Sequence, residues 1–127
     1  MRKYNEYDEI TSQIIGCAIE VHRNLGPGLL ESTYQTCLVY ELKAKNLNVQ
    51  SEIRLPIVYK DIEMDHGYCI DILVEGSVVL ELKTVECFSQ VHYAQVLTYM
   101  KLGDYPLGYL LNFEVKLMKE GIKRFVI

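Results

Sequence analysis

Two acidic residues and a lysine lie close together in a segment where polar and apolar residues alternate. Asp71 is followed after nine residues by Glu81, and Lys83 comes two residues later. Carboxylate oxygens are the ligands that Mg²⁺ and Mn²⁺ prefer, and a lysine beside such an ion can steer a water molecule or stabilise a phosphate. These residues indicate metal-assisted hydrolysis, provided that the fold brings them together.

The alternation predicts a β-hairpin that would do so. We expect strands at 68–74 and 78–85, because hydrophobic residues recur there at every second position. A three-residue loop between them would pair the aliphatic residues along one face, Val74 with Val78, Ile72 with Leu80 and Ile70 with Leu82. Since register follows the buried face, this hairpin places Asp71 directly opposite Glu81.

Two carboxylates in directly opposed positions repel each other, because their Cβ atoms are only about 4.5–5.5 Å apart. A raised pKa that keeps one of them protonated would remove the repulsion, and so would a divalent cation between them. From the hairpin alone, a ladder of Asp71, Glu81 and Lys83 charges on a solvated face is an interpretation of equal weight.

The rest of the sequence predicts a single domain, residues 1–127, of the α/β (α+β) class. Apolar residues recur every three or four positions in the expected helices, and every second position in the expected strands. Pro56 cannot donate to a ladder, so its strand should lie at an edge or bulge there. The order α-α-β-β-β-α-β-β predicts a central mixed sheet flanked by helices, with further helices at 5–24, 30–45 and 89–102 and further strands at 49–59, 107–113 and 122–127.

Three motifs, in this order along nearly the whole chain, resemble those of known proteins. Gly28, Glu31 and Tyr34 resemble the motif of the GxxExxY proteins, a group assigned to the PD-(D/E)XK nuclease fold. The segment from Asp71 to Glu81-Leu82-Lys83 resembles the metal-binding signature of that restriction-endonuclease-like fold, although Ile70 stands where the signature has proline. The helix with Gln95 and Tyr99 resembles the Gln-x-x-x-Tyr helix of the RecB-type branch.

The resemblance implies a role for each of these residues. It implies that Mg²⁺ or Mn²⁺ is the cofactor and that Lys83 and Gln95 act at the reacting phosphate, with Tyr34 and Tyr99 in support. It implies four metal ligands: the Asp71 and Glu81 carboxylates, the backbone carbonyl of Leu82, and Glu31, which binds directly or through water.

On this basis we expect a nuclease that hydrolyses DNA or, as a second choice, RNA. The alternative is a catalytically silent module of the same fold that binds nucleic acid or a protein partner, which the net charge of −4 and the absence of a substrate-recognition domain favour. The intact set of site residues argues against that alternative, and a metal-binding domain of another hydrolase class is a third interpretation. A domain this small offers little surface for a duplex, so we expect a homodimer or a partner protein to complete the groove. We expect a cytoplasmic location and no membrane association, since no signal-peptide or membrane-spanning pattern is present.

Overall fold

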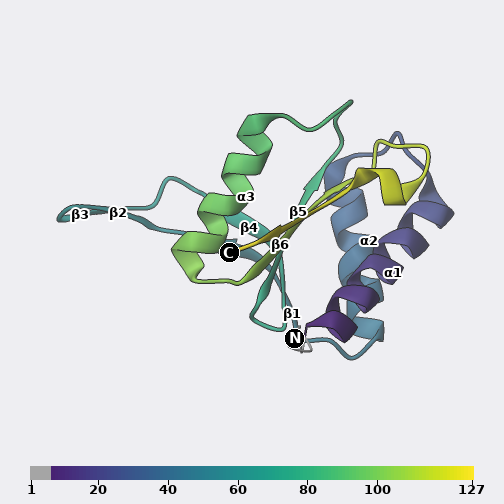
Figure 1. The fold of residues 1–127 in the computed structure, drawn as a ribbon, viewed down its shortest axis with the longest axis horizontal. Helices are drawn as coiled ribbons and strands as arrows, with labels where there is room; N and C mark the ends of the chain where they lie inside the picture. The colour runs from purple at the N-terminus through teal and green to yellow at the C-terminus, as the bar shows by residue number, and fades with distance from the viewer. Residues whose placement is uncertain (1–6) are drawn as a thin grey trace, which may run out of the picture.

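The computed structural model describes residues 7–127, which form a five-stranded mixed sheet with helices on both faces (Figure 1). The central strands β5 and β6 are parallel and every other neighbouring pair is antiparallel. The architecture confirms the predicted mixed sheet. In spatial order the strands are β1 (Val49–Arg54), β4 (Cys69–Val74), β5 (Val78–Lys83), β6 (Leu107–Asn112) and β7 (Ile122–Val126).

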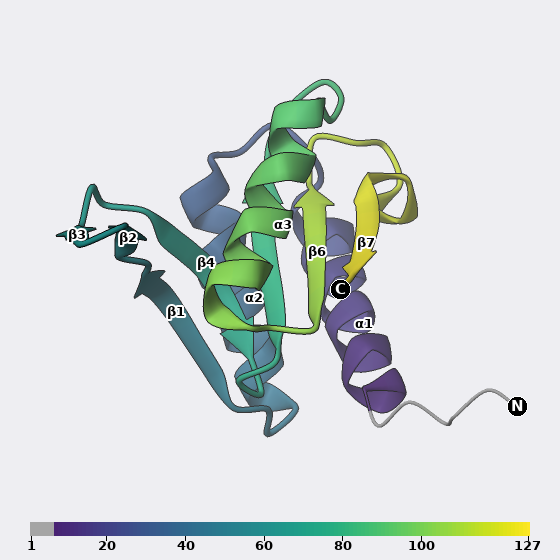
Figure 2. The same ribbon diagram turned by 60° about the vertical axis from the view of Figure 1, so that its left-hand side comes forward.

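Helices cover the two faces of the sheet separately (Figures 1 and 2). α1 (Asp8–Leu25) and α2 (Glu31–Ala44) pack on one face, and α3 (Gln90–Gly103) packs on the other. The predicted start of the first helix, at residue 5, lies outside the described residues. Because both faces are covered, β4, β5 and β6 are apolar along almost their whole length. Within residues 7–127, no helix has the length and the apolar character needed to cross a bilayer.

The hairpin of β4 and β5 has the predicted register, but its pairing stops early. Val74 pairs with Val78 and Ile72 with Leu80, as the aliphatic face requires. Pairing of Ile70 with Leu82 was also expected, and this was wrong, because the ladder ends at Ile72–Leu80. Ile70 accordingly packs in the apolar cluster under α3, while Leu82 packs in the cluster under α1 and α2.

A second hairpin, which the sequence did not predict, follows β1. The strand expected at 49–59 breaks after Arg54, and β2 (Ile57–Tyr59) pairs with β3 (Ile62–Met64) in a separate two-stranded sheet. This arm projects from the body of the molecule in both views (Figures 1 and 2). The break falls at Pro56, which has no N–H for a ladder. The strand expected to contain Pro56, at an edge or with a bulge there, is thus two strands with Pro56 between them, and the first of these, β1, lies at the edge of the sheet.

A short 3₁₀ helix, η1 (Met118–Gly121), connects β6 to β7 and was also not predicted. It is packed tightly against the end of β6, because a Cβ atom at Gly121 would overlap the carbonyl oxygen of Asn112. By contrast, a Cβ atom at Gly16, in the middle of α1, would meet nothing within 4 Å. The two glycines therefore allow a matched test of the packing at the end of β6.

We predict that Gly121→Ala lowers the free energy of unfolding by about 1–3 kcal/mol, since the backbone of β6 cannot move aside without strain. Gly16→Ala should raise it by about 0.5–1 kcal/mol, because alanine is the better helix former. Urea titrations with unchanged m-values measure both effects. Equal stability of Gly121→Ala and the unmodified chain would show that η1 is not packed as described.

Candidate active site

The two carboxylates of the predicted site lie where β4 and β5 stop pairing, and each binds a backbone amide of the hairpin. The Asp71 N–H donates to Oε2 of Glu81 at 2.8 Å, and the Leu82 N–H donates to Oδ2 of Asp71 at 2.9 Å. Side-chain oxygens therefore take the place of a continued backbone ladder. This reciprocal pair of hydrogen bonds fixes the two carboxylates against each other.

Glu81 is buried and Asp71 is half-buried, contrary to the charge ladder on a solvated face that the sequence also allowed. Glu81 is 2% exposed. Burial raises the pKa of Glu81, the negative charge of Asp71 raises it further, and the Asp71 N–H and Lys83 lower it by less. Burial also raises the pKa of Asp71, against the lowering effect of the Leu82 N–H. The pair thus retains a proton at a pH where ordinary carboxyl groups are ionised.

Lys83 is the last residue of β5 and reaches toward α3. Its Nζ donates to Oε1 of Gln95 at 2.9 Å, and Nε2 of Gln95 donates to the hydroxyl of Tyr99 at 3.2 Å. Gln95 and Tyr99 are one helical turn apart, so they present one face to the strand. The three residues form a chain of hydrogen bonds that fixes the ammonium group, and the charge of Lys83 lowers the pKa of both carboxyl groups.

Glu31 lies at the start of α2, at the same end of the sheet. Its Oε2 accepts hydrogen bonds from the backbone N–H and the hydroxyl of Thr84, at 3.2 and 3.4 Å. Its charge is close enough to contribute to the raised pKa of Asp71. However, Glu31 does not join the carboxylate pair directly: no three acidic, histidine or cysteine side chains of residues 7–127 converge closely enough to hold an ion.

The other residues of the Gly28–Glu31–Tyr34 motif hold the loop that places Glu31. Gly28 has φ +104°, which favours glycine, and its N–H donates to Oε1 of Glu114. Tyr34 is fully buried; its hydroxyl donates to the carbonyl of Gly26 at 2.5 Å and accepts from the Leu29 N–H. The tyrosine therefore braces the turn between α1 and α2.

Two polar residues close to Asp71 were not predicted from the sequence. Nε2 of Gln35 donates to the backbone carbonyl of Asp71 and to Oε1 of Glu52, both at 3.1 Å. Gln35 lies four residues after Glu31 on α2, and this spacing was the available signal. The charge of Glu52 raises the pKa of both Asp71 and Glu81, yet Glu52 reaches them only through the pairing of β1 with β4.

Asn112, at the end of β6, is a third residue that the sequence did not reveal. It is 3% exposed, and its amide binds both backbone groups of Val85, with Nδ2 donating to the carbonyl at 2.8 Å and Oδ1 accepting from the N–H at 3.2 Å. The Phe113 N–H donates to the carbonyl of Lys83. These contacts hold the chain on either side of Thr84, and they therefore position the donor groups of Thr84 that bind Glu31.

The oxygen atoms of the hairpin suit a hard divalent cation. Asp71 and Glu81 each use one oxygen for a backbone amide, and within residues 7–127 the second oxygen of each has no protein donor. The carbonyl of Leu82 lies on the same edge of β5 as its N–H, and hence beside Asp71. Two carboxylates and a carbonyl, with the remaining positions left to water, match the way Mg²⁺ is usually held better than an all-protein cage for Ca²⁺.

The fold and the carboxylate pair followed by Lys83 together define an α/β domain of the nuclease type. Comparison with known proteins agrees: the family profile of the PD-(D/E)XK nuclease superfamily matches residues 8–125, so the chain belongs to this superfamily. No curated protein and no solved structure matches the chain. Membership confirms the resemblance seen in the sequence. It suggests nuclease activity, and PD-(D/E)XK nucleases generally use divalent metal ions.

The raised pKa values predict how the stability of the metal-free protein depends on pH. A carboxyl group with a raised pKa binds more protons in the folded than in the unfolded chain. Its stabilising contribution is complete below the ordinary pKa of about 4 and is lost as the pH rises through the folded value. Urea titrations in EDTA should therefore show this contribution falling between pH 5 and pH 8.

The double variant Asp71→Asn with Glu81→Gln should remove that fall, and it should be more stable than the unmodified chain at pH 8. Asp61→Asn with Glu63→Gln is the matched control, because it neutralises two exposed carboxylates on the β2–β3 arm. The control should keep the pH dependence of the unmodified chain. If all three proteins share one pH profile, the carboxylate pair does not titrate as described.

Proposed function

We propose that this chain is a nuclease that hydrolyses phosphodiester bonds of DNA with the help of Mg²⁺ or Mn²⁺. The observation that carries the proposal is the pair of carboxylates, with Glu81 buried and Asp71 half-buried, whose pKa values are influenced by the nearby charge of Lys83. Burying two like charges side by side is unfavourable, and such pairs occur where function requires them. RNA belongs in the substrate panel, since the site has no feature that reads the sugar.

In this proposal each side chain of the site has a separate role. Asp71 and Glu81, with the Leu82 carbonyl, would hold the ion, and Glu31 would reach it through water while bound to Thr84. The ion, when bound, makes the attacking water more acidic and offsets charge on the phosphate. Lys83 has three N–H donors; one binds Gln95, and the others can orient the water or the phosphate oxygens. Gln95 holds Lys83 in position for that role.

Binding of the ion should stabilise the fold. We predict that 1 mM Mn²⁺ raises the melting temperature, by an amount set by the ratio of ion concentration to Kd. The double variant Asp71→Asn with Glu81→Gln should lose the shift and melt higher than the unmodified protein in EDTA. Asp61→Asn with Glu63→Gln should keep the shift. A missing shift and no heat of binding by calorimetry would argue against an ion at this pair.

The activity should respond in a graded way to substitutions in the site. With Mn²⁺, the purified protein should cleave DNA, and EDTA should stop the cleavage. Lys83→Ala should lower the rate by about 100-fold or more while Mn²⁺ still binds, because the lysine stabilises charge without being a ligand. Glu81→Ala should lose both the ion and the activity. Gln95→Ala should lower the rate by about 10-fold, because Gln95 orients Lys83 and does not itself neutralise charge. Tyr99→Phe should lower the rate least.

Lys43→Ala, which removes an exposed lysine of α2, is the matched control and should keep full activity. A contaminating nuclease would be equally active in every preparation. If Mn²⁺ binds but no DNA or RNA substrate is cut, the chain is a silent nuclease-fold module that binds nucleic acid or a protein. Association of two copies remains a prediction, and light scattering at tens of micromolar tests it.

A further inference from the structure

We propose that the groove between α3 and the β2–β3 arm holds unpaired bases of the substrate, so that the chain acts on single-stranded nucleic acid. This proposal rests on the nuclease function proposed above and specifies its substrate class. The groove has a volume of about 680 Å³. That size falls in the range of roughly 300–1,000 Å³ that accommodates a drug-sized ligand such as a nucleotide.

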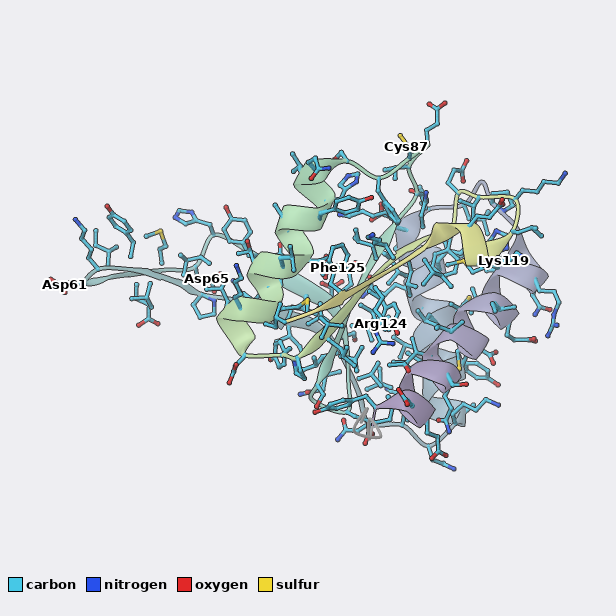
Figure 3. The ribbon with its side chains drawn as sticks, viewed as in Figure 1. Asp61, Asp65, Cys87, Lys119, Arg124 and Phe125 are labelled. Atoms are coloured by element: carbon cyan, nitrogen blue, oxygen red, sulfur yellow. The ribbon has the colours of Figure 1, made fainter. Side chains whose placement is uncertain are left out.

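The groove takes one wall from the arm and the segment after it, and the other wall from α3. Met64, His66 and Tyr68 line the first wall, and Val91, His92 and Leu102 line the second. Figure 3 labels Asp61 at the far end of the projecting arm and Asp65 near the body of the molecule. The arm that the sequence did not predict is thus the element that creates the groove.

The groove adjoins the active site through the lysine side of that site, while Asp71 and Glu81 do not line it. Lys83, Gln95 and Tyr99, which form the chain of hydrogen bonds, all line the groove. A strand with one phosphate at the carboxylate pair would therefore place a neighbouring nucleotide in the groove. Continuity with the reacting centre favours a part of the substrate as the occupant over an unrelated protein partner.

The lining suits bases and does not suit a phosphate backbone. Among the described residues that line the groove, Lys83 is the single one with a permanent charge. Phosphate-binding surfaces need several lysines or arginines, whereas bases stack on aromatic side chains. Cationic side chains gather elsewhere: Arg23, Lys116 and Lys119 line a separate cleft of about 550 Å³ beside η1.

The side chains available for stacking are accessible. Tyr68 is 48% exposed and Val91 is 75% exposed. His92 can also form a directed hydrogen bond: its Nδ1 accepts from the Ser89 N–H, so the proton of the neutral ring lies on Nε2. Bases in a duplex have their faces covered by neighbours and their edges paired, so only an unpaired base can use such a groove.

Binding of fluorescent oligonucleotides to the full chain tests the proposal. Anisotropy is measured with a labelled oligothymidylate and with a blunt duplex, in Ca²⁺ to offset the charge of the carboxylates. A gel of the same samples checks that the DNA stays intact. The single strand should bind at least about tenfold more tightly than the duplex. Tyr68→Ala should weaken single-strand binding by about tenfold, the loss expected for one stacked base.

Two variants serve as controls. Tyr68→Phe retains the ring and should bind as the unmodified chain does, and Tyr40→Ala, which removes a tyrosine that is 71% exposed on α2, should have no effect. Equal affinity for single strand and duplex would overturn the proposal, and so would unchanged binding by Tyr68→Ala. If no oligonucleotide binds while an apolar peptide shifts the amide resonances of Val91 and Leu102, the groove is a protein-binding surface and the proposal is wrong.

The test separates this proposal from the nuclease activity. Tyr68-dependent binding of the single strand, without cleavage in Mn²⁺, would refute the activity and leave base binding supported. Metal-dependent cleavage of single strand and blunt duplex at equal rates, with no effect of Tyr68→Ala, would support the nuclease activity and refute base binding in the groove.

Discussion

The reciprocal hydrogen bonds between Asp71 and the β5 strand are the interaction on which the site depends. A backbone ladder would have satisfied the amides of Asp71 and Leu82 with carbonyl oxygens; here the carboxylates of Glu81 and Asp71 accept them. Each amide lowers the pKa of the carboxylate that it binds, and so offsets a part of the effect of burial. The same two hydrogen bonds therefore mark the end of strand pairing and fix the position of the acidic pair.

Elements from both sides of the sheet converge on this point. α3 contributes Gln95, which binds Lys83, and α2 contributes Gln35, which binds the carbonyl of Asp71. Glu31 reaches Thr84 from the start of α2, and its position depends on the turn that Tyr34 braces through the carbonyl of Gly26. The spacing of Gly28, Glu31 and Tyr34 thus has a physical explanation. Gly28 permits the turn, Glu31 is positioned by the turn, and Tyr34 stabilises the turn through its hydrogen bonds.

How much of this could be predicted from the sequence depended on the range of the interactions. The register of β4 and β5 followed from local alternation, because only one pairing buries Ile72 against Leu80 on a continuous aliphatic face. The same reasoning extended the ladder too far, since it could not show that side-chain carboxylates would compete for the amides. Glu52 and Asn112 reach the site through pairing with strands distant in sequence, and no local pattern marks such residues.

The β2–β3 arm was missed for a different reason. Its strands are three residues each, too short for alternation to be distinguished from chance, and they continue the pattern of β1 across Pro56. Lys60 has a positive φ at the turn, although it is not one of the residue types that favour that conformation. A strand that simply continued through Pro56 would have left no separate arm to form a wall of the groove, so this one break in pairing determines the shape of the surface beside Lys83.

The burial of Glu81 decides between the two interpretations that the hairpin sequence left open. On a solvated face, a ladder of alternating charges would leave each group hydrated, and burial would not raise the pKa of either acid. Instead Glu81 is covered, faces the like charge of Asp71, and has Lys83 engaged with Gln95. Burial and a neighbouring like charge both disfavour the ionised form of an acid, so stability does not explain the presence of this pair. This is why the carboxylate pair, and not the charge of the chain as a whole, carries the functional proposal.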